Sequence, residues 1–276
     1  MNPTLIIIAK ELRDGLRNRW VLAVTLLLAA LALSLGFLGS APTGSVKVDP
    51  LTVTVVSLSS LSIFLVPLIA MLLSYDAIVG EIDRGTMALL LSYPIARWQV
   101  VVGKFFGHLA ILTLATVLGY GLAGVALQLA YGGLDFSTWM PFIFLIVASI
   151  LLGASFLAMG YLISSVVQER ATAAGIAIGV WLFLVVIYDM ALLGVLVADQ
   201  GRTITSPILN TILLFNPTDV YRLLNLTGYE NVSMFAGMAG LSEQARMPMP
   251  LLFGVQLLWI IVPFALAALA FRRRSI

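Results

Sequence analysis

Residues 75–104, with the sequence YDAIVGEIDRGTMALLLSYPIARWQVVVGK, form a charged interruption between two long apolar runs. Of the 276 residues in the chain, 61% are hydrophobic and only 10% are charged. An average soluble domain has about a quarter of its residues charged. The composition therefore indicates a membrane protein, and the polar stretch marks where the chain leaves the bilayer and returns to it.

Six stretches are apolar and long enough to cross the hydrocarbon core, which takes about 20 helical residues. They are Trp20–Leu38, Val53–Ser74, Phe105–Ala130, Trp139–Ser164, Ala171–Ala198 and Leu251–Phe271. A helix satisfies its own backbone hydrogen bonds in lipid, and no polar region between the spans is large enough for a separate core. The sequence therefore predicts an all-α polytopic protein with a single transmembrane domain over residues 1–276.

The Lys and Arg residues divide unevenly between the two sides of these spans. One side holds Lys10, Arg13, Arg17, Arg19, Arg84, Arg97, Lys104, Arg170, Arg272, Arg273 and Arg274, and the other holds Lys47, Arg202, Arg222 and Arg246. Loops rich in Lys and Arg stay in the cytoplasm, so both termini are predicted to be cytoplasmic. Because these residues are scattered at span ends instead of forming a basic face, no nucleic-acid partner is expected.

The first 19 residues are predicted to lie on the cytoplasmic surface of the membrane. From residue 4 onward, Leu5, Ile8, Leu12 and Leu16 recur at helical spacing, and charged residues occupy another face. Such an amphipathic helix lies in the interface and contacts the lipid bilayer. It is either a topology anchor alone or also a surface that contacts a partner, and the sequence leaves both alternatives open.

Residues 76–104 are predicted to contain a second, shorter interfacial helix. Gly85 and Pro94 break helices, and they frame a helix of about two turns. A segment of about 30 residues is unusually long for a plain connection between two spans. We therefore interpret it as a partner-binding segment.

The same segment resembles the coupling region of the ABC-2 type permeases. The pattern of that family is a Glu, a Gly-Thr pair, an apolar stretch, a Pro, an Arg and a Gly-Lys pair. The chain supplies them as Glu81, Gly85-Thr86, Met87–Leu91, Pro94, Arg97 and Gly103-Lys104. Together with the N-terminal helix and the six spans, the resemblance covers nearly the whole chain.

The resemblance implies a type V exporter-like permease fold and a non-catalytic subunit of an ATP-binding cassette transporter in the bacterial inner membrane. It implies a separate cytoplasmic ATPase that binds ATP and Mg²⁺, and a second copy of this chain. The implied contacts with the ATPase are Glu81, Asp83, Arg84, Gly85, Thr86, Met87, Leu90, Pro94, Arg97 and Lys104, with Glu169 and Arg170 as a second, smaller contact. Glu81 and Arg84 are expected to act electrostatically, and Met87–Leu91 through apolar contact.

Residues 216–223, NPTDVYRL, narrow the resemblance to permeases of transporters that support copper-site maturation of nitrous oxide reductase. This narrower resemblance implies a periplasmic accessory protein at the outer loop, residues 199–250, and a role in the assembly of copper and sulfur centres. Residue spacing by itself identifies no cargo.

The outer loop is predicted to form short helices packed on the outer face, because long loops without structure are uncommon. Met234, Met238, Met247 and Met249 lie near its end, and thioethers suit Cu(I). Since neither His nor Cys lies nearby, we interpret these methionines as residues that fill apolar gaps, with Cu(I) ligation as the alternative.

Asp189 lies inside the fifth predicted span, where an ionisable residue is costly and is therefore a functional candidate. It either lines a translocation path or is a hydrogen-bonded structural residue. The sequence favours neither alternative over the other.

The sequence predicts no cofactor bound by this chain. Gly103-Lys104 has no preceding phosphate-binding loop. One His, no Cys and one mid-span Asp are too few groups for an intramembrane hydrolase. The alternative to a transporter subunit is a stand-alone ion-coupled membrane carrier.

Overall fold

The computed structural model describes residues 3–17, 19–38, 50–131, 136–199, 203–227 and 247–274. Within these ranges the secondary structure is helical and contains no strand, which confirms the predicted all-α class. The helices are α1 (Pro3–Arg17), α2 (Arg19–Leu38), α3 (Pro50–Ser74), α4 (Val79–Asp83), α5 (Thr86–Leu91), α6 (Arg97–Tyr131), α7 (Phe136–Val166), α8 (Arg170–Leu182), α9 (Tyr188–Asp199), α10 (Ser206–Leu214), α11 (Pro217–Thr227) and α12 (Met249–Arg273), with a π-helical turn η1 (Phe183–Ile187) between α8 and α9.

Five helical stretches of the described chain are long and apolar enough to cross a membrane on their own. They are Ser57–Asp83, Arg97–Ala130, Trp139–Val166, Arg170–Asp199 and Met249–Arg273. The remaining predicted span coincides with α2, which meets the same test only together with α1, and the two helices are bent by 66°. The described chain thus has five spans, or six when this bent pair is counted.

The C-terminal part of the segment 76–104 differs from the prediction. The third span begins as a helix at Arg97 instead of Phe105, so residues 97–104 form the first two turns of α6. The predicted short helix between Gly85 and Pro94 is present as α5, Thr86–Leu91. Only residues 75–96, between α3 and α6, therefore lie outside the long helices.

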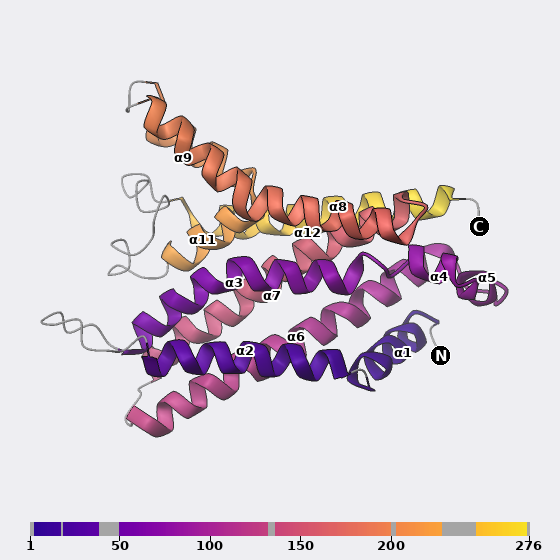
Figure 1. The fold of residues 1–276 in the computed structure, drawn as a ribbon, viewed down its shortest axis with the longest axis horizontal. Helices are drawn as coiled ribbons and strands as arrows, with labels where there is room; N and C mark the ends of the chain where they lie inside the picture. The colour runs from indigo at the N-terminus through magenta and orange to yellow at the C-terminus, as the bar shows by residue number, and fades with distance from the viewer. Residues whose placement is uncertain are drawn as a thin grey trace, which may run out of the picture.

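Helix α7 lies at the centre of the bundle and packs against α3, α6 and α12. Its apolar window is 67% buried, compared with 17% for α8–α9 and 22% for α12. The last two elements therefore present broad apolar faces that are available to lipid or to another protein. Figure 1 shows α9 inclined away from the rest of the bundle.

Both termini lie at the same end of the bundle, together with α1, α4 and α5 (Figure 1). Helix α11 lies toward the opposite end. An arrangement with both termini at one end agrees with an even number of crossings.

Two glycines on α6 allow α1 to approach closely. A Cβ atom at Gly103 would lie 2.7 Å from Cβ of Ile7, and one at Gly107 would lie 2.5 Å from Cβ of Glu11. Ile7 and Glu11 are accordingly the buried residues of α1. Leu5 and Leu16, from the predicted apolar face, are 60% and 58% exposed, as expected for side chains that contact lipid.

Replacing Gly103 by Val is expected to lower the stability of the protein by about 1–3 kcal/mol, because overpacking would force α1 away from α6. Thermal unfolding in detergent measures the effect. Gly121 lies on the same helix with no atom within 4 Å of an added Cβ, so Gly121→Val is the matched control. Equal melting temperatures for the two variants would contradict the close α1–α6 contact.

Candidate functional site

Helix α4 is fixed to α7 through its N-terminal backbone. The N–H groups of Ile78 and Val79 both donate to Ser164 Oγ, at 3.0 Å, which satisfies donors that a helix start otherwise leaves unpaired. Position 80 requires glycine, because a Cβ atom there would lie 2.0 Å from Oδ1 of Asp76. The first part of the segment therefore has a fixed position on the bundle.

The Gly85-Thr86 pair shapes the turn between α4 and α5. Gly85 has a φ of 72°, a left-handed conformation that glycine adopts without steric cost. Thr86 Oγ1 donates to the carbonyl oxygen of Glu81 at 3.1 Å, and so pairs an end carbonyl of α4. Met87 then packs into the core with no exposed surface.

The remaining side chains around α5 form an exposed surface of mixed character, which we call the α5 surface. It consists of Asp83, Arg84, Leu89, Tyr93 and Trp98. The three apolar members are 69%, 66% and 56% exposed, respectively. Large apolar side chains gathered at one exposed place indicate contact with another protein or with lipid.

Behind this surface, ionisable side chains from three helices meet in a buried cluster, which we call the Lys104 cluster. Lys104 Nζ on α6 lies 2.9 Å from Oε1 of Glu11 on α1 and 2.7 Å from Oε1 of Glu81 on α4. His108 Nε2 lies 3.5 Å from the second oxygen of Glu11. The hydroxyl of Tyr161 on α7 lies 2.8 Å from His108 Nδ1. One ammonium group thus connects α1, α4 and α6, and the histidine extends the cluster to α7.

The Lys104 cluster depends on complete pairing because it is shielded from water. The side chains of Lys104 and Glu11 are only 4% and 9% exposed. Burial alone would raise the pKa of Glu11, but hydrogen bonds from His108 and Lys104, with the charge of Lys104, lower this pKa below its usual range. The ionised carboxylate therefore holds α1 against α6.

A second ionic group lies nearer the surface. Asp76, which follows α3, lies 2.8 Å from Nε of Arg170 and 3.4 Å from a terminal nitrogen of Arg84. It connects the end of α3 to the start of α8 and to the turn before α5. Both arginines are half exposed, so these pairs are screened more strongly than those of Lys104.

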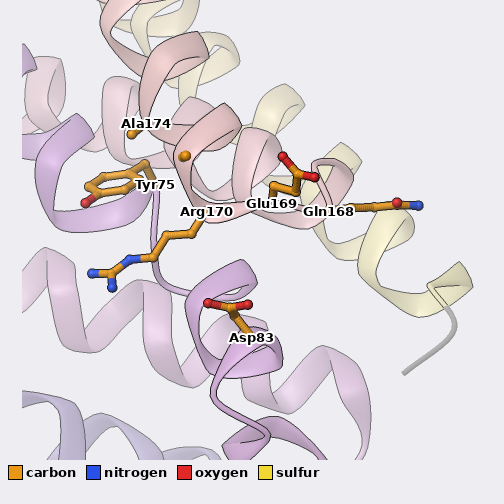
Figure 2. Close-up of a pocket in the computed structure, with 7 residues that line it drawn as sticks. Tyr75, Asp83, Gln168, Glu169, Arg170 and Ala174 are labelled. Atoms are coloured by element: carbon orange, nitrogen blue, oxygen red, sulfur yellow. The ribbon is translucent and has the colours of Figure 1, made fainter.

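An open pocket of about 480 Å³ lies beside Arg170. It is lined by Tyr75, Asp83, Gln168, Glu169, Arg170, Ala171 and Ala174. Figure 2 shows the Arg170 side chain extending between Tyr75 and the helix that carries Asp83. The pocket therefore joins the α4–α5 region to the turn between α7 and α8, which were predicted as two separate contacts.

The Arg97 side chain binds backbone carbonyl groups at the C-terminal end of α12. Its guanidinium donates to the carbonyl oxygens of Phe271 and Arg272 at 3.4 Å, and also to that of Arg274. Arg274 in turn donates to the carbonyl oxygens of Ser164 and Ser165 at 3.0 and 3.1 Å. Cations are favourable at the C-terminal ends of helices, so these two arginines stabilise the ends of α12 and α7.

The predicted contact residues fall into three groups in the structure. Asp83, Arg84, Gly85, Thr86, Pro94, Glu169 and Arg170 are exposed, Glu81, Leu90 and Arg97 are partly buried, and Met87 and Lys104 are buried. Contact with a partner stays a prediction for the exposed group. Met87 and Lys104 do not reach the surface, because Met87 packs in the core and Lys104 pairs with two carboxylates.

Sequence reasoning missed several members of this region. Glu11 gave no signal beyond being an acidic residue in an amphipathic helix, and its partner Lys104 is distant in the sequence. Tyr93 and Trp98 lie next to the predicted Pro94 and Arg97 but were not included. The exposed apolar residue of α5 is Leu89, whereas the predicted Met87 points inward.

At the other end of the bundle, Asp189 is paired. Its Oδ2 lies 2.7 Å from Arg222, and the same guanidinium lies 2.6 Å from Oδ1 of Asp219. This geometry favours the structural alternative for Asp189, and a role in a translocation path stays untested.

The outer methionines divide between described and undescribed residues. Met247 and Met249 pack against an apolar cluster that includes Leu223 and Leu252. Met234 and Met238 lie outside the described residues. In the part of the chain that the structure describes, no three His, Asp or Glu residues are grouped so as to hold a metal ion.

A helical bundle with repeated apolar spans and an anchored, partly exposed short helix defines an all-α polytopic membrane protein. Residues 5–276 match the family described as "ABC-2 family transporter protein", and the chain belongs to this family. It is 44% identical to the "Probable ABC transporter permease protein NosY" of Stutzerimonas stutzeri over 275 residues, 99% of each chain. It is also 44% identical to the protein of the same name from Pseudomonas aeruginosa over 268 residues, 97% of each chain.

Replacing Lys104 by Met is expected to destabilise the protein by about 3–5 kcal/mol, because it leaves two carboxylates close together without their buried partner. Lys10 lies at the rim of the same cluster and its side chain is 54% exposed, so Lys10→Met is the control and should cost at most about 1 kcal/mol. Thermal melting in detergent compares the two variants. Equal losses would contradict a buried, structural role for Lys104.

Acidification is expected to destabilise the protein through Glu11. Because the folded-state pKa of Glu11 is lowered, its contribution is complete above the unfolded carboxyl pKa of about 4.3 and is lost as the pH falls below that value. Melting temperatures from about pH 7 down to about pH 3 should therefore fall more steeply for the wild type than for Glu11→Gln. Parallel curves would show that Glu11 does not carry this dependence.

Proposed function

We propose that this chain is the permease subunit that couples ATP hydrolysis by a separate cytoplasmic ATPase to work on the outer side of the membrane. The observation that carries the proposal is the α5 surface, which exposes Leu89 on the short helix α5, Tyr93 just after it and Trp98 at the start of α6. The excess of Lys and Arg on the side of the termini supports a cytoplasmic location for this surface.

The ATPase contacts the α5 surface and the pocket beside Arg170. Leu89, Tyr93 and Trp98 supply apolar area, and aromatic side chains of this kind often dominate the binding energy of an interface. Asp83, Arg84, Glu169 and Arg170 supply charges of both signs around it. These rim charges set the orientation of the partner more than its affinity.

Force from the ATPase reaches the spans through the Lys104 cluster. Pressure on α5 moves α4, and α4 is joined to α6 by the 2.7 Å pair between Glu81 and Lys104. Lys104 and Glu11 extend the connection to α1, and His108 and Tyr161 extend it to α7. The binding energy of the ATPase thereby shifts the balance between two packings of the bundle.

The chain itself has no catalytic site in this proposal. ATP and Mg²⁺ bind to the ATPase, because the chain lacks the glycine-rich loop that cradles phosphates. Gly103-Lys104 serves the contact with α1, where glycine permits close approach and lysine binds Glu11.

A second copy of this chain completes the transporter. The faces of α8–α9 and α12 are the largest apolar surfaces that the described bundle leaves uncovered. Gly175 and Gly179 on α8 have open space around them, and small residues permit close helix packing between membrane proteins. These faces support a homodimer in the bacterial inner membrane.

The work done on the outer side belongs to copper- and sulfur-centre maturation of nitrous oxide reductase, with a periplasmic accessory protein at residues 199–250. The relatives named NosY and the 216–223 sequence support this assignment. The alternative of a stand-alone ion-coupled carrier has less support, because Asp189, its main candidate, is paired with Arg222.

Replacing Leu89 and Tyr93 together by Ala is expected to weaken ATPase binding at least tenfold, since truncating central interface residues costs about 1–2 kcal/mol or more each. The measurement is the affinity of purified ATPase for the chain in nanodiscs. Leu5→Ala is the control, because Leu5 is also an exposed leucine, at 60%, on the same end of the bundle. Unchanged affinity in the double variant would refute the proposed contact.

Charge reversal at Glu81 is a poorer test of the same contact. It would place a cation beside Lys104 and disrupt the bundle before it affected a partner. The exposed residues of the α5 surface avoid this difficulty.

A further inference from the structure

The fifth membrane span contains a π-helical turn, η1, between α8 and α9. In a regular α-helix the carbonyl of Leu184 would accept the N–H of Tyr188, but that N–H bonds to the carbonyl of Phe183. Single π-turns inside α-helices are rare and occur frequently at functional sites. The Leu184 carbonyl therefore lies at an irregularity in the span Arg170–Asp199, which has the smallest buried share among the five described spans.

One side chain from outside the span binds this carbonyl. Asn216 Nδ2 donates to the oxygen of Leu184 at 2.9 Å. The Thr218 hydroxyl has a single hydrogen, which it donates to Asn216 Oδ1 at 2.8 Å, and Thr218 Oγ1 lies 3.4 Å from the Leu184 oxygen. Both side chains are fully buried, so water does not compete for these hydrogen bonds. The start of α11 is thus attached to the backbone of the π-turn.

Asn216 also begins α11. Its Oδ1 accepts the N–H of Thr218 at 3.1 Å, as an N-cap residue does, and Pro217 occupies the first position of the helix. The amide nitrogen and the amide oxygen of one side chain therefore connect two elements, the π-turn and α11.

A second connection lies one turn further along. Arg222 on α11 binds Asp189, just past the π-turn, at 2.7 Å. Tyr188 donates its hydroxyl hydrogen to the carbonyl of Ile212 at the end of α10, at 2.7 Å. Both residues of α9 that follow η1 directly are thus bound to the α10–α11 segment.

The short helices predicted in the outer loop are present as α10 and α11, and α11 packs firmly on the bundle. Val220, Tyr221 and Leu224 are fully buried, and α11 packs against α3, α7 and α12. By contrast, α9 buries only Leu192 and diverges from the bundle (Figure 1). The contacts of η1, Tyr188 and Asp189 with α10–α11 therefore hold the outer half of the fifth span.

We infer that Asn216 and Thr218 are positioning residues that make the π-turn and the α10–α11 segment move as one body. Bending of the fifth span at η1 then displaces α10–α11, which lie within the outer loop. This joint is the route by which movement of the bundle reaches a protein bound outside. The inference rests on the proposed function for the source of the movement and for the protein bound outside.

The test uses amide hydrogen exchange of the full chain in nanodiscs. Asn216→Ser keeps an oxygen that caps α11 but loses the amide that reaches Leu184. In the chain alone, exchange in peptides covering 183–189 and 206–227 should rise at least about tenfold, because the variant loses the hydrogen bonds from Asn216 Nδ2 to the Leu184 oxygen and to Asp219 Oδ2. Thr211→Ala is the matched control, because the Thr211 hydroxyl is exposed and bonds only within α10, to Pro207. Unchanged exchange in Asn216→Ser would overturn the inference.

A second measurement adds the ATPase with ATP and vanadate. In the wild type, both peptides should change exchange together, and in Asn216→Ser only the 183–189 peptide should respond. A response of 206–227 that persists in the variant would contradict the joint movement of the π-turn and α10–α11.

If Asn216→Ser fails to fold, Thr218→Val provides the same comparison with a smaller expected effect. Exchange at residues 79–98 that stays unchanged when the ATPase is added would instead count against the proposed ATPase contact, so the two failures are distinguishable.

Discussion

The ammonium group of Lys104, held between the carboxylates of Glu11 and Glu81, is the interaction on which the end of the bundle that carries both termini depends. Taking charges out of water is unfavourable unless each is paired, so α1, α4 and α6 have to meet at one point. Lys104 lies 2.9 Å from Glu11 and 2.7 Å from Glu81. Gly103 and Gly107 flank it and let α1 come close enough for the pairing. The amphipathic helix on the membrane surface is thereby joined to the segment that bears α5.

The same kind of interaction, a buried polar side chain bound to the backbone of another element, occurs at both ends of the bundle. At one end, Ser164 on α7 binds the start of α4, and at the other, Asn216 binds the π-turn of the fifth span. In both places a short helix that its own hydrogen bonds would not stabilise is fixed by buried polar side chains. Short elements with fixed positions transmit displacement, whereas a flexible loop would absorb it. The proposed passage of movement from the α5 surface to α11 relies on these two attachments.

Local signals predicted local structure well. Gly85 and Pro94 correctly framed α5, because a left-handed glycine and a proline act on the backbone where they stand. Such signals could not predict which α5 side chains face the core. Met87 is buried and Leu89 is exposed because of the position in which α5 packs on the bundle. Likewise, short helices were predicted in the outer loop, but which side chains of α11 are buried depends on its contacts with α3, α7 and α12. Pairings such as Glu11 with Lys104 join residues that no local pattern relates.

The sequence by itself determined the class of the protein: apolar runs of spanning length can only be membrane helices, since lipid leaves the backbone no other partners. It also determined the family and the place of the short helix between two spans. The tertiary structure alone decided which motif residues face outward and which hold the bundle together. The physical reason is that burial and charge pairing depend on distances between helices, and the order of residues along one helix does not fix those distances. Glu81 and Lys104 thus belong to the interior, and Leu89, Tyr93 and Trp98 to the surface.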